Sequence, residues 1–223
     1  MGDACYNDRV TAPKRLPRGP HHLSRDQVSQ SQRERLLEAM AEAVADKGYA
    51  RTSVADVLSR AGVSRATFYQ MFKDKDDCFR AAFDAFAERL SALMDSVLEG
   101  VRLAGEADPM EKLDRVVTSY LSVLQFAPAL ARVFLVEVYA AGPDVIEQRR
   151  KSLERFIDVV AETHRGCPGL FGTDPDQRFA VTVFVSAVSQ MVTQAVGTGK
   201  LDEIPKLREQ ILGVARRISA VPL

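Results

Sequence analysis

Hydrophobic and polar positions follow a helical pattern along the chain from about residue 30. Between Gln30 and Lys47, apolar residues recur at three- and four-residue steps, and Gly48 follows as an end signal. A longer stretch, from about Lys75 to Leu98, repeats this spacing with aromatic residues in many apolar positions. Both stretches predict amphipathic helices. Their buried positions are Leu36, Leu37, Met40, Ala41, Val44 and Ala45 in the first, and Phe79, Phe83, Phe86, Leu90, Leu93, Met94 and Val97 in the second.

Further helices are predicted at about 108–126, 128–140, 143–165, 176–198 and 202–219. Pro109 and Pro143 fit helix starts, where proline is tolerated in the first turn. The segment 180–188 is rich in β-branched residues and admits a strand as an alternative. Its apolar pattern continues through Val196, which is too long for a typical strand and favours a helix. The sequence therefore predicts an all-α fold of about nine helices.

Two short helices joined by a tight turn are predicted between residues 51 and 75. Ser53 and Asp56 have the spacing of a capping box, although Thr52 is an alternative N-cap. Gly62 suits the end of this helix, and Ser64 suits the N-cap of a second helix that runs to Phe72. This is the helix-turn-helix pattern. The same spacing also occurs in ordinary helical packing.

The second short helix has one face suited to packing and one suited to DNA. Arg65 can pair with guanine, Gln70 with adenine, and Thr67 with a phosphate or a thymine methyl group. Tyr69 and Lys75 suit phosphate contacts, which fix register without reading sequence. The inward face is expected to consist of Ala66, Phe68 and Phe72, with a contribution from Met71.

Residues 31–79 resemble the DNA-binding domain of the TetR family of transcriptional regulators. The resemblance covers roughly a quarter of the chain, and the remainder is similar to the family only in length and helical character. Met71 and Leu58 depart from the family's usual residues, which makes a polar base contact at position 71 doubtful. The matching stretches are Gly48-Tyr49, Thr52-Ser53-Val54, Ala61-Gly62-Val63-Ser64, Thr67-Phe68-Tyr69, Phe72 and Lys75.

The resemblance implies a DNA-binding role for a defined set of positions, with phosphate contacts from Thr52, Tyr69 and Lys75. It also implies that the helix beginning near Lys75 connects DNA-binding and ligand-binding domains. Pairing of the last two helices, about 176–219, would form a homodimer, whose two-fold symmetry predicts a near-palindromic operator. The expected DNA-binding residues are Thr52, Ser53, Ser64, Arg65, Ala66, Thr67, Tyr69, Gln70, Lys73 and Lys75.

Three segments are expected along the chain: a flexible basic arm at 1–30, the helix-turn-helix domain at 31–78, and a helical ligand-binding and dimerisation domain at 79–223. The arm contains prolines and scattered arginines without apolar periodicity. It either contacts DNA, as some N-terminal arms do, or is a tail without a specific role.

The larger domain is expected to bind a small apolar or amphipathic effector, since apolar cavities with a few polar groups are typical ligand sites. Glu137 lies in an otherwise apolar helix and needs a partner if buried. Arg132, Arg149 or Arg150 would supply a structural partner, which is the favoured interpretation; a cationic ligand is the alternative. The candidate effector residues are Tyr120, Leu124, Phe134, Glu137, Val138, Tyr139, Phe156, Phe184 and Met191, although each is also an ordinary core candidate.

Composition limits the other classes of function. The net charge is zero and the charged fraction is 27%, which argues against a non-specific nucleic-acid coating protein. Cys5, Cys78 and Cys167 form no disulfide framework, and Cys78 is expected to be a packing residue. His164 and Cys167 alone are too few for a metal site, so neither metal nor cofactor is expected.

No signal-peptide core or uninterrupted membrane-length apolar run is present, so a cytoplasmic location without membrane contact is expected. No nucleophile elbow, P-loop or dinucleotide fingerprint is found, which argues against an enzyme. A scaffolding protein is disfavoured by the outward face that begins at Arg65. The favoured hypothesis is therefore a bacterial-type transcriptional repressor that binds double-stranded DNA as a homodimer and is released by a small molecule.

Overall fold

The computed structural model describes residues 24–103, 108–164, 168–172 and 177–219, and these residues form an all-α fold without strands. The predicted fold class is confirmed, including the segment 180–188 as helix. The helix that the sequence pattern did not indicate is α8, which has 4 residues. The helices are α1 (Arg25–Lys47), α2 (Val54–Ala61), α3 (Arg65–Met71), α4 (Lys75–Leu103), α5 (Pro109–Phe126), α6 (Pro128–Leu135), α7 (Pro143–Thr163), α8 (Pro168–Phe171), α9 (Gln177–Gly197) and α10 (Ile204–Ser219), with 3-10 segments η1 (Tyr49–Arg51), η2 (Glu137–Ala140) and η3 (Leu201–Glu203).

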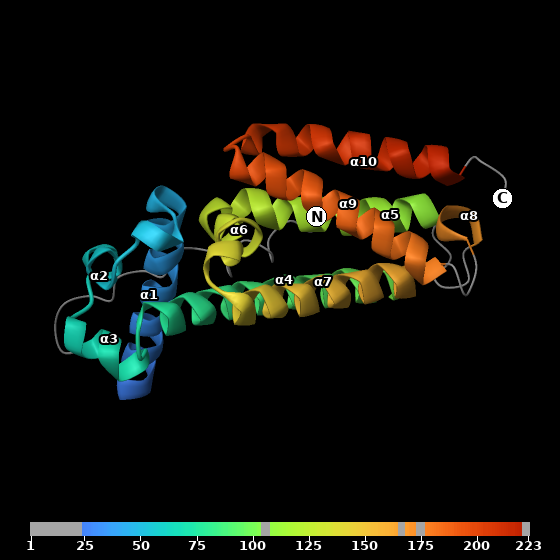
Figure 1. Ribbon diagram of the computed structural model, residues 1–223. Helices are drawn as coiled ribbons and strands as arrows, with labels where there is room; N and C mark the ends of the chain where they lie inside the picture. The colour runs from blue at the N-terminus through green and yellow to red at the C-terminus, as the bar shows by residue number, and fades with distance from the viewer. Residues whose placement is uncertain (1–23, 104–107, 165–167, 173–176, 220–223) are drawn as a thin grey trace.

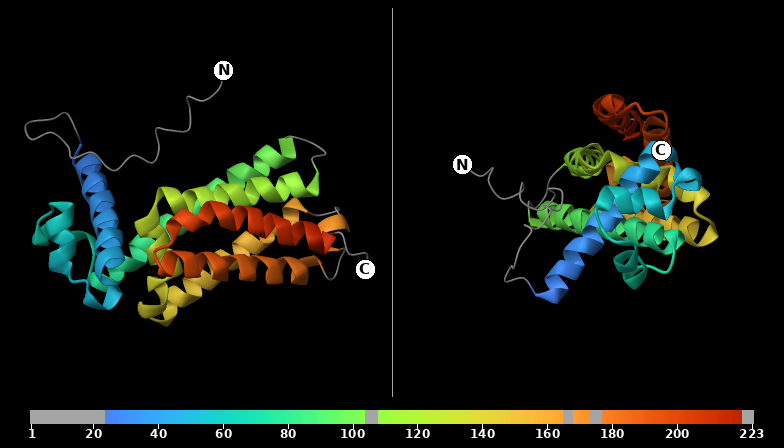
Figure 2. Two further views of the ribbon diagram at one scale, coloured as in Figure 1. Left: turned by 90° about the horizontal axis from the view of Figure 1, so that it is seen from above. Right: turned by 90° about the vertical axis from the view of Figure 1, so that its left-hand side faces the viewer.

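Helices α1, α2 and α3 form a small unit at one end of the molecule, and α4 extends from it along the larger helical unit (Figures 1 and 2). Helix α1 begins at Arg25, earlier than expected, because Ser24 and Gln27 form a capping box. Residues 24–30, assigned to the arm from sequence, are therefore capped helix. The rest of that arm, residues 1–23, lies outside the described residues.

The small unit is organised by the start and end signals of its helices. Ser53 is the N-cap of α2, and its capping box with Asp56 is formed as predicted. Gly62 ends this helix in the left-handed conformation, with φ of 62°. Ser64 then caps α3. The unit's largest fully buried side chains are Leu36, Met40 and Val44 of α1 and Phe68 of α3.

Helix α4 joins the two units through buried aromatic side chains. Tyr49 packs edge-on against Phe79, with ring centroids 4.7 Å apart. One turn further along α4, Phe83 stacks on Phe134 of α6 at 5.0 Å. Since α6 also packs against α1, both α4 and α6 connect the small unit to the larger one.

Cys78 is a packing residue, as expected. It is fully buried in the core, and burial raises the pKa of its thiol to about 12. The low thiolate fraction makes it unsuitable as a redox sensor. Cys5 and Cys167 lie outside the described residues.

His164 is buried where α5, α7 and α9 meet, and it serves a structural role. Its ring nitrogens lie 2.8 Å from the carbonyl oxygen of Val160 and 3.1 Å from that of Pro109. The side-chain amide of Gln177 donates to the backbone carbonyl of His164. Within the described ranges, no group of three or more His, Cys, Asp or Glu side chains is placed to hold a metal ion.

Acidification is expected to destabilise the protein partly through His164. Burial lowers the pKa of its imidazole, so below the ordinary value of about 6.5 the unfolded chain binds a proton that the folded chain resists. Stability should therefore fall as the pH drops from about 7.5 to about 5.5. Urea denaturation of the wild type and of His164→Gln checks this prediction. An equal loss of stability in both proteins would assign the acid sensitivity to other groups.

Helix α9 has a buried inner face, and from Phe179 onward its outer face carries no charge. By length and composition alone, α9 is apolar enough to span a membrane, with a mean hydropathy of 1.6, and the bent pair α5–α6 passes the same test. Core helices of soluble proteins also pass it. Helix α9 packs against α6, α7 and α10, whereas Phe179 and Val183 project outward.

Candidate DNA-binding surface and effector cavity

Helix α3 presents one exposed polar face. Ser64 Oγ accepts a hydrogen bond of 3.0 Å from the backbone N–H of Thr67, which fixes the first turn. Phe68 and Phe72 are buried, with ring centroids 5.6 Å apart. On the other side, Tyr69 is 50% exposed. The other exposed side chains of the helix are Arg65, Ala66 and Gln70, so four of the expected DNA-binding residues share one surface.

The inward position expected for Ala66 is wrong. Ala66 is exposed, and Met71 is half-buried. Two residues correspond to about 200° of rotation on an α-helix, so Ala66 cannot share the face of Phe68. Phe68 and Phe72, four residues apart, instead make the contact with the rest of the small unit.

Basic groups on this surface are free of ion pairs. Arg65 and Lys73 are exposed, and neither takes part in an ion pair within the part of the chain that the structure describes. Lys47 and Arg60, in contrast, pair with Asp56 and Asp46. The guanidinium and ammonium groups beside α3 are therefore available to phosphates or base edges.

Two of the residues expected to contact phosphate already donate hydrogen bonds to backbone carbonyls of the small unit. Thr52 is 3% exposed, and its hydroxyl donates to the carbonyls of Ala43 and Gly48, at 3.2 and 2.9 Å. Lys75 is half-buried, donates to the carbonyl of Tyr49 at 3.2 Å, and lies 4.1 Å from the Tyr49 ring centroid. The packing therefore argues against a phosphate contact from Thr52, whereas Lys75 retains two further N–H donors.

Ser53 and Thr67 are already engaged in local hydrogen bonds. Ser53 Oγ donates to Asp56 at 2.7 Å in the capping box. The Thr67 hydroxyl lies 2.8 Å from that of Ser64. Both stand at helix starts, where backbone N–H groups and the positive end of the helix dipole also favour phosphate.

A buried carboxylate links the two units. Glu137 of η2 is 9% exposed and accepts a hydrogen bond of 2.9 Å from the backbone N–H of Tyr49. Its other oxygen lies 3.3 Å from Nε of Arg132, as an ion pair without good hydrogen-bond alignment. Of the three arginines considered as partners, Arg132 is therefore the one that pairs.

Tyr49 extends this link to the start of α4. Its hydroxyl donates to Asp76 at 2.5 Å, and burial together with this carboxylate raises the pKa of the phenol. Lys75, beside the same ring, completes the group. The Glu137 bridge, which we define as Arg132, Glu137, Tyr49, Lys75 and Asp76, thus connects the end of α6 to the segment that follows α3.

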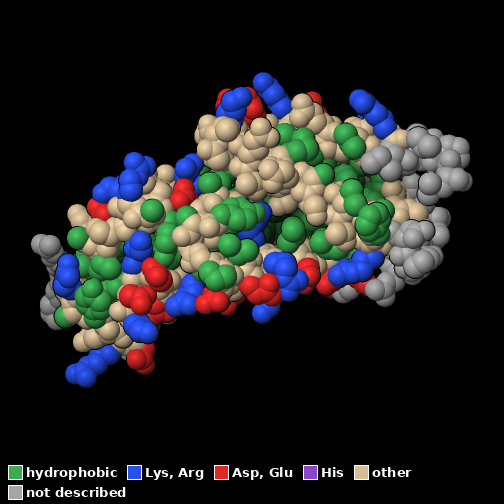
Figure 3. All heavy atoms as spheres, in the orientation of Figure 1, with side chains coloured by type: hydrophobic (Ala, Val, Ile, Leu, Met, Phe, Trp, Pro, Cys, Tyr) green, Lys and Arg blue, Asp and Glu red, His purple; other side chains and the backbone are tan. Residues whose placement is uncertain are grey.

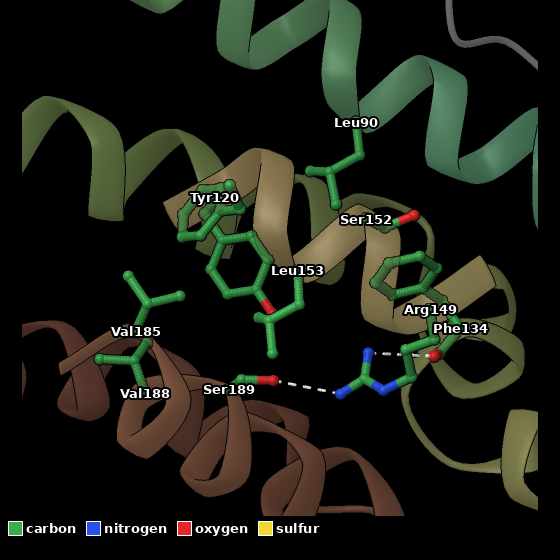
Figure 4. Close-up of a pocket in the computed structure, with 10 residues that line it drawn as sticks. Leu90, Tyr120, Phe134, Arg149, Ser152, Leu153, Val185, Val188 and Ser189 are labelled. Atoms are coloured by element: carbon green, nitrogen blue, oxygen red, sulfur yellow. Dashed lines mark hydrogen bonds between the residues drawn. The ribbon is translucent and has the colours of Figure 1, made fainter. Parts of the chain in front are cut away.

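The larger unit contains a small cavity between α4, α5, α6, α7 and α9 (Figure 4). Its volume is about 20 Å³, enough for about one water molecule. Three expected effector residues, Tyr120, Phe134 and Phe156, line it. The full lining is Leu90, Tyr120, Phe134, Arg149, Ser152, Leu153, Phe156, Val185, Val188 and Ser189.

The other expected effector residues lie elsewhere. Phe184 lines a neighbouring apolar hollow. Leu124 and Val138 are fully buried core residues outside the cavity lining. Met191 is 38% exposed and faces outward from α9. Tyr139 is 56% exposed and outside the cavity lining, but its hydroxyl accepts a hydrogen bond of 3.3 Å from Nε of the lining residue Arg149. The remaining candidate, Glu137, belongs to the bridge.

Arg149 is the charged residue of the cavity lining, and the sequence pattern indicated it only as a candidate partner for Glu137. It is 8% exposed, and its guanidinium donates to the Phe134 carbonyl at 3.3 Å and to Ser189 Oγ at 3.1 Å (Figure 4). It is in helical phase with Leu153, Phe156 and Val160, the buried face of α7. This spacing was the available signal that Arg149 points inward.

Comparison with known proteins agrees with the helix-turn-helix geometry. Residues 36–82 match the model of the bacterial regulatory proteins of the tetR family. The chain is 24% identical over 125 residues to the fatty acid metabolism regulator protein of Bacillus subtilis (strain 168), which covers 56% of this chain and 62% of that protein, slightly less than two thirds of its length. It is 27% identical over 162 residues to the HTH-type transcriptional activator FasR of Mycolicibacterium smegmatis, covering 72% and 70% of the two chains.

The fold extends this similarity over most of the molecule. The transcriptional regulator FadR from Bacillus subtilis, solved in complex with stearoyl-CoA, superimposes with a TM-score of 0.62 at 20% identity, covering 80% of this chain and 96% of that chain. At this identity the likeness concerns the fold alone. These relatives are transcriptional regulators, which confirms the prediction that the chain is not an enzyme. Residues 36–82 are therefore assigned to the DNA-binding domain of the tetR family of bacterial regulatory proteins, and the rest of the chain shares the fold of these solved regulators.

Proposed function

We propose that this regulator is a repressor that binds a near-palindromic operator as a homodimer and is released by a small molecule. The observation that carries the proposal is the exposed face of α3, with Arg65, Tyr69 and Gln70 side by side and Arg65 outside any described ion pair. Such a face fits a major groove, where residues near the N-terminus of a recognition helix contact bases. The proposed surface is completed by Ser53, Ser64, Ala66, Thr67, Lys73 and Lys75.

An electrophoretic shift assay tests this function, with purified protein and the DNA upstream of its own gene as the probe. A discrete complex that survives competition by unrelated DNA is expected, because base contacts add to the phosphate contacts common to all sequences. Binding that disappears with unrelated competitor, or no binding at low salt to any nearby promoter fragment, would argue against a sequence-specific regulator.

We propose that residues 31–78 form the DNA-binding domain and that residues 79–223 form the effector-binding and dimerisation domain. The residues before position 31 comprise the first turns of α1 and an arm outside the described residues. We assign no base contact to this arm. Its basic residues would contribute electrostatic attraction to DNA.

The proposed dimer forms through α9 and α10. Between Phe179 and Gly197, α9 carries no charged residue, and its outer side chains are mainly apolar or small. Figure 3 shows few charged side chains over this helix and many along the edge formed by α4 and α7. An uncharged face of this kind is suited to burial against a two-fold related copy. Val214 provides an exposed apolar side chain on α10.

Val183→Glu is expected to weaken the dimer at least about tenfold, because symmetry places two carboxylates in an apolar interface. Val183 is 53% exposed in the single chain, so the substitution should not affect folding. Sedimentation velocity at several concentrations measures the shift from dimer to monomer. Leu103→Glu, at an exposed position of α4, is the matched control. An unchanged dimer in Val183→Glu would place the interface elsewhere.

The effector is proposed to be amphipathic, and two relatives support this. One is named as a regulator of fatty acid metabolism, and another was solved with stearoyl-CoA. Repression rather than activation is also part of the proposal, because another relative is named as an activator. Release requires that the effector bind more tightly to a conformation whose α3 helices no longer fit successive major grooves.

A further inference from the structure

The cavity in the larger unit contains a buried cation that no acidic side chain neutralises. Arg149 is 8% exposed, and its acceptors are the carbonyl of Phe134 and the hydroxyls of Tyr139, Ser189 and Thr193. Within the described ranges, none of the ion pairs includes it. Two other arginines of the larger unit differ, because Arg132 pairs with Glu137, and Arg150 with Glu147 and Glu154. A buried charge without an opposite partner is costly, so this one is poised to receive an anion.

The other polar groups of the cavity are suited to the same ligand. Tyr120, Ser152 and Ser189 line it, and no Asp or Glu is among its described lining residues. Burial raises the pKa of Tyr120 to about 12, so its phenol keeps its proton. Hydroxyl groups can reorient from accepting to donating. The Ser152 hydroxyl is already engaged, because it donates to the carbonyl of Gln148 at 3.0 Å. One guanidinium and the hydroxyls of Tyr120 and Ser189 therefore line a space that attracts an oxyanion and repels a cation.

The rest of the cavity wall is apolar and continues away from Arg149. Tyr120, Phe156, Val185 and Val188 are shared with a second hollow, whose other lining residues are Leu113, Val116, Val117, Val160 and Phe184. Along α7, the distance from Arg149 to Val160 is about 16 Å at 1.5 Å per residue. The two hollows together form an apolar track with a cation at one end.

We infer that the effector is a single-chain amphipath with a free carboxylate, which pairs with Arg149 while its chain lies beside Tyr120 and Phe156. The inference rests on the proposed ligand-responsive function and names the class of ligand. The cavity must widen to accept a chain. A groove of about 250 Å³ between α4 and α7 shares Leu90, Ser152 and Phe156 with the cavity and provides the adjacent opening.

The same pairing explains how ligand binding in the larger unit would affect the DNA-binding unit. The Arg149 guanidinium now holds the carbonyl of Phe134 near the end of α6. A ligand carboxylate that binds this guanidinium would compete with the Phe134 carbonyl for the N–H groups of Arg149. Helix α6 packs against α1 and leads directly into Glu137, whose carboxylate contacts Tyr49. Loss of the hydrogen bond between Arg149 and α6 would therefore disturb the contacts of the Glu137 bridge.

Calorimetric titration of the full-length protein with dodecanoate, 1-dodecanol and methyl dodecanoate, each kept below its aggregation threshold, tests the inference. Dodecanoate should bind the wild type at least about tenfold more tightly than the two uncharged compounds, as a charge-assisted hydrogen bond implies. Arg149→Gln should remove this preference, and Arg150→Gln, at the neighbouring exposed arginine, should retain it. Arg149→Lys keeps the charge and should retain part of the preference, which covers the case in which Arg149→Gln does not fold.

Equal binding of acid and alcohol by the wild type, or an acid preference that survives in Arg149→Gln, would overturn the inference. Tighter binding of dodecanoyl-CoA that does not depend on Arg149 would also overturn it in favour of a thioester. These titrations contain no DNA. A failure here with intact operator binding therefore rejects the ligand class alone, whereas loss of all sequence-specific DNA binding rejects the proposed regulator.

Discussion

Replacing Arg65 and Tyr69 together by alanine is expected to weaken operator binding at least about a hundredfold while leaving the protein folded. A good base contact contributes about 1–3 kcal/mol, and a dimer loses both side chains in each of two half-sites. Both residues are exposed, so the free energy of unfolding should change by no more than about 0.5 kcal/mol each. Fluorescence anisotropy with the selected operator measures the affinity, and thermal denaturation measures the fold.

The single variants separate the two kinds of contact. Arg65→Ala should lower affinity and also relax the preference at one base position, whereas Tyr69→Ala should weaken binding to all sequences alike. Arg115→Ala, at an exposed arginine of α5, removes the same charge away from the small unit and should leave binding nearly unchanged. Operator affinity that stays normal in the folded double variant would remove α3 from the DNA interface.

Glu137→Ala is expected to destabilise the contact between the two units by about 2–3 kcal/mol. The substitution leaves the buried backbone N–H of Tyr49 without an acceptor and Arg132 without its partner. The effector should then change operator affinity much less than in the wild type, because the Glu137 bridge is a direct contact between the units. Chemical denaturation measures the first effect, and operator titration with and without effector measures the second.

Glu137→Gln is the matched comparison for this prediction. Its amide oxygen can still accept from Tyr49, whereas the charge facing Arg132 is lost, so the loss of stability should be smaller. If both variants are as stable as the wild type and respond normally to effector, the Glu137 bridge does not hold or couple the units.

The helix-turn-helix was predictable because its signals are local. The capping box at Ser53 and Asp56, the left-handed Gly62 and the N-cap at Ser64 act within a few residues, and the structure contains all three. The capping box at Ser24 and Gln27 has the same spacing and equally marks a helix start. It was missed because the residues before it resemble a flexible arm.

The bridge and the cavity were harder to predict because they depend on distant contacts. Glu137 and Tyr49 are 88 positions apart, and nothing local indicates that a backbone N–H would be the partner. Arg149 stands beside other basic residues, which suggests a solvated position. Only its helical phase with Leu153 and Phe156 indicates that it points inward. Met191 has an apolar side chain in an apolar helix, yet it faces outward, since α9 has two apolar faces.

Selection of bound fragments from random DNA by the purified protein tests the central claim most directly. We expect a near-palindromic sequence with half-sites separated by about one helical turn or a multiple of it, and loss of the enrichment in Arg65→Ala/Tyr69→Ala. A folded, dimeric protein that enriches no sequence would contradict it.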